Sequence, residues 1–283
     1  TYGEDKHGRP RFKFVDQAQT DERDDEMQEA AVLMGGGGAQ GDSKLCFRFA
    51  QDGAISRHVL PASYWWREPF MRALDDFTRA NDCTLVSVRD LIASGELAVQ
   101  PGHGSPNSHF KRQGTVPYVK VTDIKNWRVN ENPEYAIPES EAARLRRSRL
   151  LRPYDLVTPT RASKNIGLFG VIMPWQTHVV LTREIAIWRT PQAAARLDPW
   201  LLLALLSLKV VHDQFRFLVL MQTNREDLGD RYQELLLPIP NDNERREEWA
   251  EPIRRYFEAT TLARLSYDAL AESLDPSLFA DRP

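Results

Sequence analysis

The most regular pattern in the sequence is a helical repeat near its C-terminus. Mostly apolar residues recur at alternating four- and three-residue steps: Trp249, Ile253, Tyr256, Thr260, Ala263, Tyr267, Leu270 and Leu274. Such spacing forms the seam of a helix that packs lengthwise against another helix. We therefore predict a long coiled-coil-like helix over residues 243–274, beginning at Asn241 or Asn243. The spacing leaves open whether its partner lies in the same chain or in a second copy.

Before this helix, strand-like and helical patterns alternate. We predict helical spacing over 61–83, strands over 116–124 and 178–190, a basic helix over 140–151, and a final strand over 235–240. The apolar flanks 156–160 and 166–172 predict a hairpin whose tip carries Arg161, Ser163, Lys164 and Asn165. Asp198 as N-cap and Pro199 at the first helical position predict that the leucine-rich segment begins a buried helix.

These elements predict an α+β fold with three parts. Residues 1–83 are an N-terminal linker or extension, residues 84–240 form a domain with a mixed, curved sheet and packed helices, and residues 241–283 form the long spacer or docking helix. Gly36, Gly38 and Gly41 match the G-x-G-x-x-G dinucleotide spacing, but a strand-like segment, rather than a helix, follows them. We interpret the glycines as a linker, with a phosphate-binding loop as the alternative.

Charge is distributed unevenly along the chain. The net charge is −3, but residues 101–190 contain fourteen Lys and Arg against seven acids, so this segment is +7 and the remainder −10. Two cysteines are too few for a disulfide framework or a cysteine-rich zinc site. No signal peptide or membrane-spanning run is recognisable. We expect a cytoplasmic protein that does not associate with a membrane.

Catalytic motifs are missing from the sequence. The six histidines are scattered, and no H-E-x-x-H, P-loop or G-x-S-x-G motif occurs. Asp123 and Lys125 form the D-x-K half of a metal-dependent nuclease motif without an upstream Pro-Asp pair, so a Mg²⁺-dependent nuclease stays a further hypothesis. No Asn-Pro-Pro-aromatic motif or suitable glycine loop for S-adenosylmethionine is present. We expect no catalytic residue, no metal site and no cofactor.

Because the sequence has no catalytic motif, we next consider binding. Three polar, basic segments, 105–114, 122–128 and 160–165, adjoin strand-like supports. Lysine and arginine can pair with guanine or phosphate, and asparagine with adenine. Ordinary solvated turns are the alternative. The predicted DNA-binding residues are Ser108, Lys111, Arg112, Lys120, Lys125, Arg128, Arg161, Ser163, Lys164 and Asn165.

Residues 84–275 resemble the target-recognition domain of type I restriction-modification specificity subunits and the related C-terminal domains of N6-adenine methyltransferases. The resemblance rests on five segments in order. They are "GHGSPNSHFKRQGTVPYVKVTDIKNW", "LLRPYDLVTPTRASKNIGLFGVIMP", "VVLTREIAIWR", "DPWLLLALLSLKVVHDQ" and the stretch from "NREDLGDRYQELLLPIP" into the last helix. A full specificity subunit has two recognition domains and two spacer helices, whereas this chain has room for one of each.

The resemblance implies a module that recognises double-stranded DNA for a restriction-modification or phage-defence methyltransferase. Catalysis and S-adenosylmethionine would then belong to a partner adenine-methyltransferase domain or subunit. The stretch "YGEDKHGRPRF" (2–12) is similar to the end of such catalytic domains, which implies that this chain is the C-terminal part of a methylase, or one part of a split methylase. The chain would read one half-site or self-associate through helix 243–274. The alternative is a non-catalytic assembly subunit of a defence complex.

Overall fold

The computed structural model describes residues 12–15, 18–23, 67–147, 149–161, 163–191, 194, 196–222 and 225–273. The chain divides into two compact units, residues 1–65 and 66–283. In the first unit, β1 (Phe12–Val15) pairs antiparallel with β2 (Ala18–Arg23). The glycine-rich segment and residues 2–11 lie outside the described residues, so the predictions made for them stay predictions.

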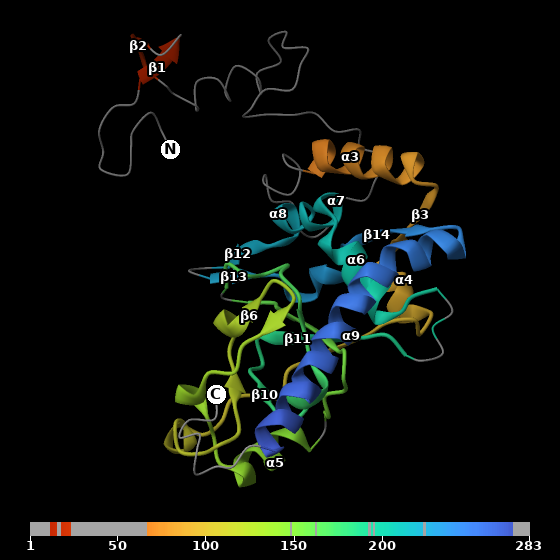
Figure 1. Ribbon diagram of the computed structural model, residues 1–283. Helices are drawn as coiled ribbons and strands as arrows, with labels where there is room; N and C mark the ends of the chain where they lie inside the picture. The colour runs from red at the N-terminus through yellow and green to blue at the C-terminus, as the bar shows by residue number, and fades with distance from the viewer. Residues whose placement is uncertain are drawn as a thin grey trace. The chain divides into compact units, whose positions relative to one another are not determined.

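A four-stranded antiparallel sheet forms the centre of the second unit (Figure 1). Its strands, in order, are β4 (Ala98–Pro101), β11 (Ile185–Arg189), β8 (Leu156–Pro159) and β9 (Gly170–Val171). In β11, Ala186 and Trp188 belong to one hydrophobic cluster, whereas Ile185 and Ile187 belong to another. This alternation follows the two-residue period of a strand. The sheet is therefore buried on both faces.

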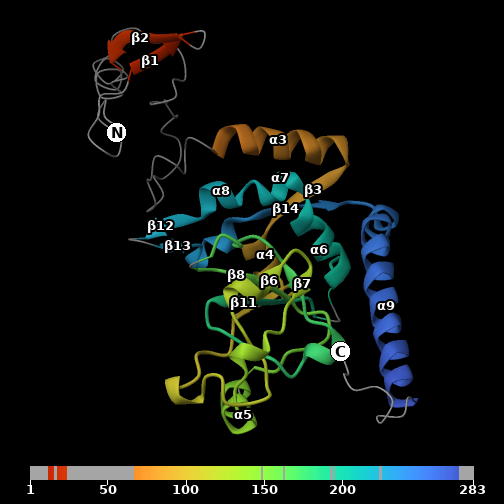
Figure 2. The same ribbon diagram turned by 60° about the vertical axis from the view of Figure 1, so that its left-hand side comes forward.

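Helices contribute to the larger of the two clusters. They are α3 (Arg67–Ala80), α4 (Val88–Ala93), α6 (Pro199–Ser207), α7 (Lys209–His212), α8 (Phe215–Leu218) and α9 (Asn243–Ser273). The predicted cap of α6 is confirmed, because the Asp198 carboxylate accepts a hydrogen bond from the Leu201 N–H at 2.7 Å. Figure 2 shows α9 beside α6. The rings of Trp200 and Phe257 stack between these helices with centroids 5.3 Å apart.

Short strands pack against the other face of the sheet. They are β5 (Tyr118–Val119), β6 (Ile124–Lys125), β7 (Arg128–Val129) and β10 (Val180–Leu181). β5 and β10 pair in parallel, whereas β6 and β7 form an antiparallel hairpin. Beside them, α5 (Glu139–Arg146) contributes to a small third hydrophobic cluster. The predicted mixed α+β class, with packed helices and a long C-terminal helix, is confirmed, and its strands are divided among several small sheets.

Two further strand pairs complete the second unit. β3 (Cys83–Ser87) pairs antiparallel with β14 (Leu236–Pro240), so Cys83 lies opposite Pro240. The two ends of the predicted segment 84–240 are thereby adjacent. β12 (Leu220–Gln222) and β13 (Arg225–Asp227) form a hairpin. None of the described helices is long and apolar enough to cross a membrane.

A buried ion pair connects β11 to the segment that precedes β8. Asp155, which is 2% exposed, accepts hydrogen bonds from Arg189 Nε at 2.7 Å and Nη2 at 2.6 Å. Asp155 also accepts the Arg152 N–H at 2.8 Å, while Arg189 donates to the Leu150 carbonyl at 2.8 Å. The partners are 34 residues apart in the sequence. The pair therefore fixes the C-terminal end of β11 to the loop that precedes β8.

Two predicted strands and one predicted hairpin differ from the observed structure. The predicted strand 116–124 is interrupted by a 3₁₀ turn, Val121–Asp123, because Asp123 Oδ2 accepts the Lys120 N–H at 2.8 Å. Such side-chain bonds compete with strand pairing. In the predicted hairpin, β8 and β9 do pair, but β9 begins only at Gly170. The connection between the two strands is therefore longer than the predicted tip, residues 161–165. The predicted strand over 178–190 is likewise divided between β10 and β11.

The buried stripe of α9 also differs in part from the predicted seam. Ile253 is buried as predicted, together with Ala250 and Phe257. Tyr256, in contrast, is 43% exposed. The second half of the helix carries further exposed apolar side chains at Leu262, Leu265, Tyr267 and Leu270. The N-terminal half of α9 thus packs within this chain, while the predicted seam of its C-terminal half faces solvent.

Candidate nucleic-acid interface

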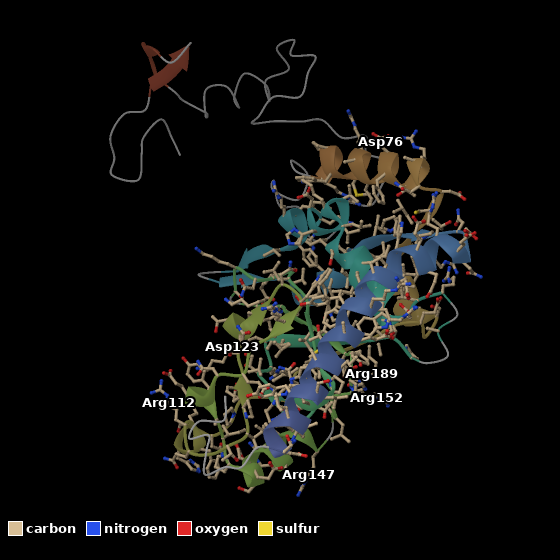
Figure 3. All side chains as sticks on the ribbon, viewed as in Figure 1. Asp76, Arg112, Asp123, Arg147, Arg152 and Arg189 are labelled. Carbon is tan, nitrogen blue, oxygen red and sulfur yellow. The ribbon has the colours of Figure 1, made fainter. Side chains whose placement is uncertain are left out.

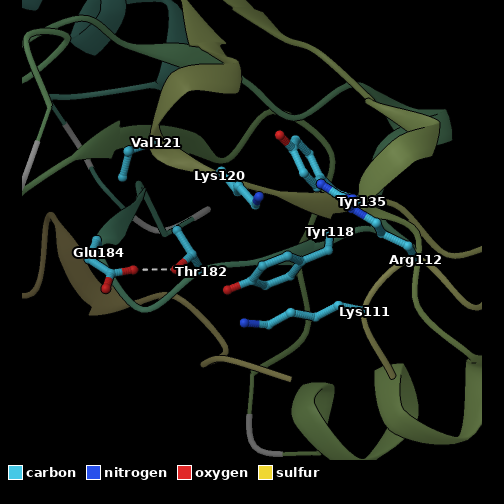
Figure 4. A pocket seen from close by; sticks show the side chains of 8 residues that line it. All are labelled: Lys111, Arg112, Tyr118, Lys120, Val121, Tyr135, Thr182 and Glu184. Atoms are coloured by element: carbon cyan, nitrogen blue, oxygen red, sulfur yellow. Dashed lines mark hydrogen bonds between the residues drawn. The ribbon is translucent and has the colours of Figure 1, made fainter. Parts of the chain in front are cut away.

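Three of the predicted DNA-binding residues line one hollow in the surface of the second unit, which we call the first hollow (Figure 4). Its volume is about 410 Å³, and it is lined by Lys111, Arg112, Tyr118, Lys120, Val121, Tyr135, Thr182 and Glu184. These residues come from the loop before β5, from β5 and the turn after it, from the Pro133–Tyr135 turn and from the β10–β11 turn. In Figure 3, Arg112 projects from the opposite side of the unit to Arg152 and Arg189.

A tyrosine ring positions two cations in the first hollow. Lys120 Nζ lies 3.0 Å from the centroid of the Tyr135 ring, and the guanidinium carbon of Arg112 lies 5.8 Å from it. Arg112 adopts a positive φ of 66°, which is uncommon for a residue other than glycine. An aromatic face attracts cations without neutralising them. Both positive charges therefore remain available to an anion.

A buried glutamate anchors the loop that carries Lys111 and Arg112. Glu141 on α5 accepts the Asn107 N–H at 3.0 Å and two hydrogen bonds from Arg144 at 2.7 Å. The Arg144 bonds, followed by the Asn107 bond, lower the pKa of Glu141 to about 2. Beyond Arg112, a Cβ on Gly114 would lie 2.0 Å from the carbonyl carbon of Ile137. The loop is therefore fixed on both sides of its two cations.

His103 ties the beginning of the same loop to β10 and to Arg149. Its Nδ1 accepts the Leu181 N–H at 2.9 Å, and its Nε2 lies 2.8 Å from the Arg149 carbonyl oxygen. A neutral imidazole protonated at Nε2 satisfies both partners. Burial lowers the pKa of His103 to about 4. The support of the loop thus depends on a neutral histidine.

A second hollow, of about 650 Å³, adjoins the first and shares Glu184 with it. It contains Arg161, whose Nε and Nη2 lie 2.7 Å and 2.6 Å from Asp227 Oδ2. Arg161 is therefore paired within the chain, although its side chain is 53% exposed. The lining residues are Val99, Gln100, Pro101, Thr160, Arg161, Arg183, Glu184, Ile185, Ala186, Asp227, Gly229, Asp230 and Tyr232.

The β6–β7 hairpin carries two more predicted residues. Lys125 and Arg128 are opposite each other in its register, and both are exposed. Between them, Trp127 adopts a φ of +63° and donates its Nε1–H to Ser207 Oγ at 3.0 Å. The Trp127 ring also contacts the ring of Tyr256, with centroids 6.0 Å apart. The tryptophan thus holds the hairpin against α6 and α9.

The remaining predicted residues fall into two groups. Ser163 Oγ accepts the Asn165 N–H at 3.0 Å, and Asn165 Nδ2 donates to the Ile124 carbonyl at 2.9 Å. Ser163 thus stabilises a turn in the β8–β9 connection, and Asn165 ties that connection to β6. Lys164 and Ser108, in contrast, are exposed. The ten predicted residues therefore do not converge on one point; Lys111, Arg112 and Lys120 do.

Asp123 has a structural role rather than the geometry of a metal ligand. It is 9% exposed, and its Oδ2 caps the turn that begins after Lys120. Lys125 is exposed on the following strand. Among the residues that the structure describes, no group of three His, Cys, Asp or Glu side chains could hold a metal ion. This arrangement adds no support to the nuclease hypothesis.

Most of the cations around these hollows are unpaired. Within the described part of the chain, no carboxylate forms an ion pair with Lys111, Arg112, Lys120, Lys125, Arg128, Lys164 or Arg183. Sequence reasoning missed Tyr118, Tyr135, Thr182, Arg183 and Glu184. The sequence held one signal for Thr182, Arg183 and Glu184: they form a polar triplet inside "VVLTREIAIW". Three consecutive polar residues are not typical of an uninterrupted buried strand, and the strand does break there.

No protein-family model and no curated protein matches the sequence. The structure resembles type I restriction-modification specificity subunits. The HsdS subunit from Thermoanaerobacter tengcongensis aligns with 11% identity and a TM-score of 0.39, over 69% of this chain and 44% of that one. The type I S subunit from M. genitalium aligns with 9% identity and a TM-score of 0.40, over 67% and 41%.

A third similar chain comes from work on complex assembly and conformational transition of the type I R-M system. It aligns with 14% identity and a TM-score of 0.40, over 73% of this chain and 51% of that one. The chain thus spans about half the length of the solved chains that it resembles.

Proposed function

We propose that the second unit is a sequence-specific DNA-recognition module of a restriction-modification or phage-defence methyltransferase system. The observation that carries this proposal is the first hollow, where Lys111, Arg112 and Lys120 converge without an ion pair to any described carboxylate. Unpaired lysines and arginines on loops held by a rigid scaffold suit the phosphate backbone of DNA. The exposed Lys125 and Arg128 of the hairpin would extend this contact.

The module would have no catalysis of its own. Methyl transfer would be carried out by an adenine-methyltransferase domain or subunit that binds S-adenosylmethionine, as the sequence resemblance over residues 84–275 implies. The role of this chain would be to select the DNA sequence at which that partner acts. Phosphate contacts would fix the register, and side chains that reach base edges would supply the selectivity.

Removal of two cations from the first hollow should weaken DNA binding. For the double variant Lys111→Ala/Lys120→Ala, we expect about tenfold to a hundredfold lower affinity for duplex DNA near physiological salt. The slope of the logarithm of the binding constant against the logarithm of salt concentration is negative, and its magnitude should fall by roughly two, because the variant displaces about two fewer counterions from the DNA. Fluorescence anisotropy over a salt series measures both quantities.

The matched control is Arg67→Ala/Arg89→Ala, which removes the same charge from exposed positions on α3 and α4. It should leave the salt slope within experimental error of the wild-type value. If both double variants weaken binding equally, only net charge matters and the first hollow is not the DNA site. Circular dichroism verifies that each variant is folded.

A second candidate function, an assembly subunit, is favoured by the exposed half of α9. Tyr267 and Leu270 continue the heptad seam there and are 38% and 56% exposed. An exposed coiled-coil seam of this kind can pack against another helix. We propose that a second copy of the chain supplies that helix, which would also give the complex two recognition modules.

Charges placed on the seam should prevent this self-association. For Ala263→Glu/Leu270→Glu, we expect the dissociation constant of the dimer to rise by at least about tenfold, because like charges would meet at a packed seam. Analytical ultracentrifugation over a concentration series measures it. The control Leu262→Glu/Leu265→Glu changes two exposed leucines on another side of the same helix. A wild-type chain that stays monomeric throughout would contradict the proposal.

A further inference from the structure

Glu184 occupies a fixed position between the two hollows. It lies in the turn that joins β10 to β11 and lines both hollows. Its carbonyl oxygen accepts the Thr160 N–H at 2.8 Å and the Thr160 hydroxyl at 3.0 Å. One carboxylate oxygen, Oε2, accepts a hydrogen bond from the hydroxyl of Thr182. In Figure 4, Glu184 and Arg112 lie at opposite sides of the first hollow.

Glu184 forms no ion pair with a described residue, although cations line both of its hollows. Lys111, Arg112 and Lys120 share the first hollow with it, and Arg161 and Arg183 share the second. None of them forms an ion pair with Glu184, and Arg161 pairs with Asp227 instead. Its other carboxylate oxygen, Oε1, receives no hydrogen bond from a described residue. A half-buried carboxylate thus presents an unused acceptor within a cationic surface.

A carboxylate in this place opposes the binding of phosphate, because both groups are negative. It is favourable where it meets a hydrogen-bond donor. On the edges of base pairs in the major groove, the donors are the amino groups at N4 of cytosine and N6 of adenine. Adenine places its N7 acceptor next to that amino group, which suits an amide better than a carboxylate. Guanine and thymine present no hydrogen-bond donor there.

We propose that Glu184 is a specificity-determining residue that accepts a hydrogen bond from the N4 amino group of a cytosine. This inference rests on the proposed function. The guanine paired with that cytosine presents its O6 and N7 acceptors alongside, and a cation of the same hollow that is not bound to a phosphate is suited to those acceptors. A G·C pair would therefore complement the carboxylate and a cation together.

The test uses the full chain and the isosteric variant Glu184→Gln. Duplexes selected from a random-sequence pool are sequenced, and affinities for the best site and its single-base variants are measured. Wild-type protein should prefer cytosine at one position of the site. In Glu184→Gln, that preference should fall by roughly fivefold to a hundredfold, while preferences at other positions persist. Affinity for unrelated duplexes should be unchanged or higher, because a negative charge has been removed.

A modified base tests the same hydrogen bond from the DNA side. Replacement of that cytosine by pyrimidin-2-one, which lacks the amino group, should weaken binding by the wild-type protein. It should weaken binding by Glu184→Gln by a smaller factor, since the amide oxygen of glutamine accepts this hydrogen bond without the charge that strengthens it. Asp230→Asn is the matched control, because Asp230 has the same charge but lines only the second hollow. It should retain the cytosine preference.

The outcomes separate the inference from the proposed function. If the wild-type chain enriches no sequence from the pool, both fail. If the wild-type chain is selective and Glu184→Gln keeps every base preference, with or without a uniform rise in affinity, the recognition module stands and the role of Glu184 is wrong. Loss of the preference in Asp230→Asn as well would attribute it to the overall charge of the surface, which also overturns the assignment to Glu184.

Discussion

Replacement of Arg189 by methionine is expected to destabilise the second unit by about 3 to 5 kcal/mol. Arg189 is the only described ion-pair partner of Asp155, which is 2% exposed. Methionine keeps much of the apolar stem but leaves the carboxylate buried without a counter-charge. Chemical unfolding at neutral pH, followed by tryptophan fluorescence, gives the change in the free energy of unfolding.

Two further variants identify the cause of this loss. Arg79→Met breaks the Arg79–Asp76 pair, whose side chains are 77% and 72% exposed, and should change stability by less than about 1 kcal/mol. Adding Asp155→Asn to Arg189→Met removes the unpaired charge and should recover part of the lost stability. If the double variant is no more stable than Arg189→Met, the loss arises from packing or from the Leu150 hydrogen bond.

Local chemistry in the sequence was sufficient to predict several elements. The Asp198 cap with Pro199 identified the start of α6, and the heptad spacing identified α9 and its buried Ile253. Strand 116–124 was wrong because a single side chain, Asp123, binds the Lys120 N–H and turns the chain. Alternation of apolar residues cannot reveal that the Asp123 carboxylate binds the Lys120 N–H. An aspartate at this position is equally compatible with a strand at the edge of a sheet.

The candidate site was less accessible to prediction because it depends on distant contacts. The sequence identified Lys111, Arg112 and Lys120 as basic residues, but not the ring of Tyr135 that positions two of them. The pairing of Arg161 with Asp227 spans 66 residues. No short-range pattern distinguishes a paired arginine from a free one, and none indicates that the β10–β11 turn lines both hollows.

Acidification from about pH 6.5 to about pH 4 should destabilise the second unit through His103. Burial lowers the pKa of His103 to about 4 from an ordinary value of 6.5. In this interval the unfolded chain binds the proton and the folded chain does not, so the stability that is complete above about pH 6.5 is lost as the pH falls. The full loss is about 3 kcal/mol, and most of it should be complete by about pH 4.5.

The measurement is the free energy of unfolding at several pH values between 7 and 5, where ordinary carboxylates remain largely ionised. In His103→Asn, which cannot titrate, the curve should be flatter by about 2 kcal/mol over this interval. His178→Gln removes an exposed histidine and should keep the wild-type slope. A wild-type curve as flat as that of His103→Asn would mean that the folded unit accepts the proton at His103, and that the loop carrying Lys111 and Arg112 does not depend on a neutral ring.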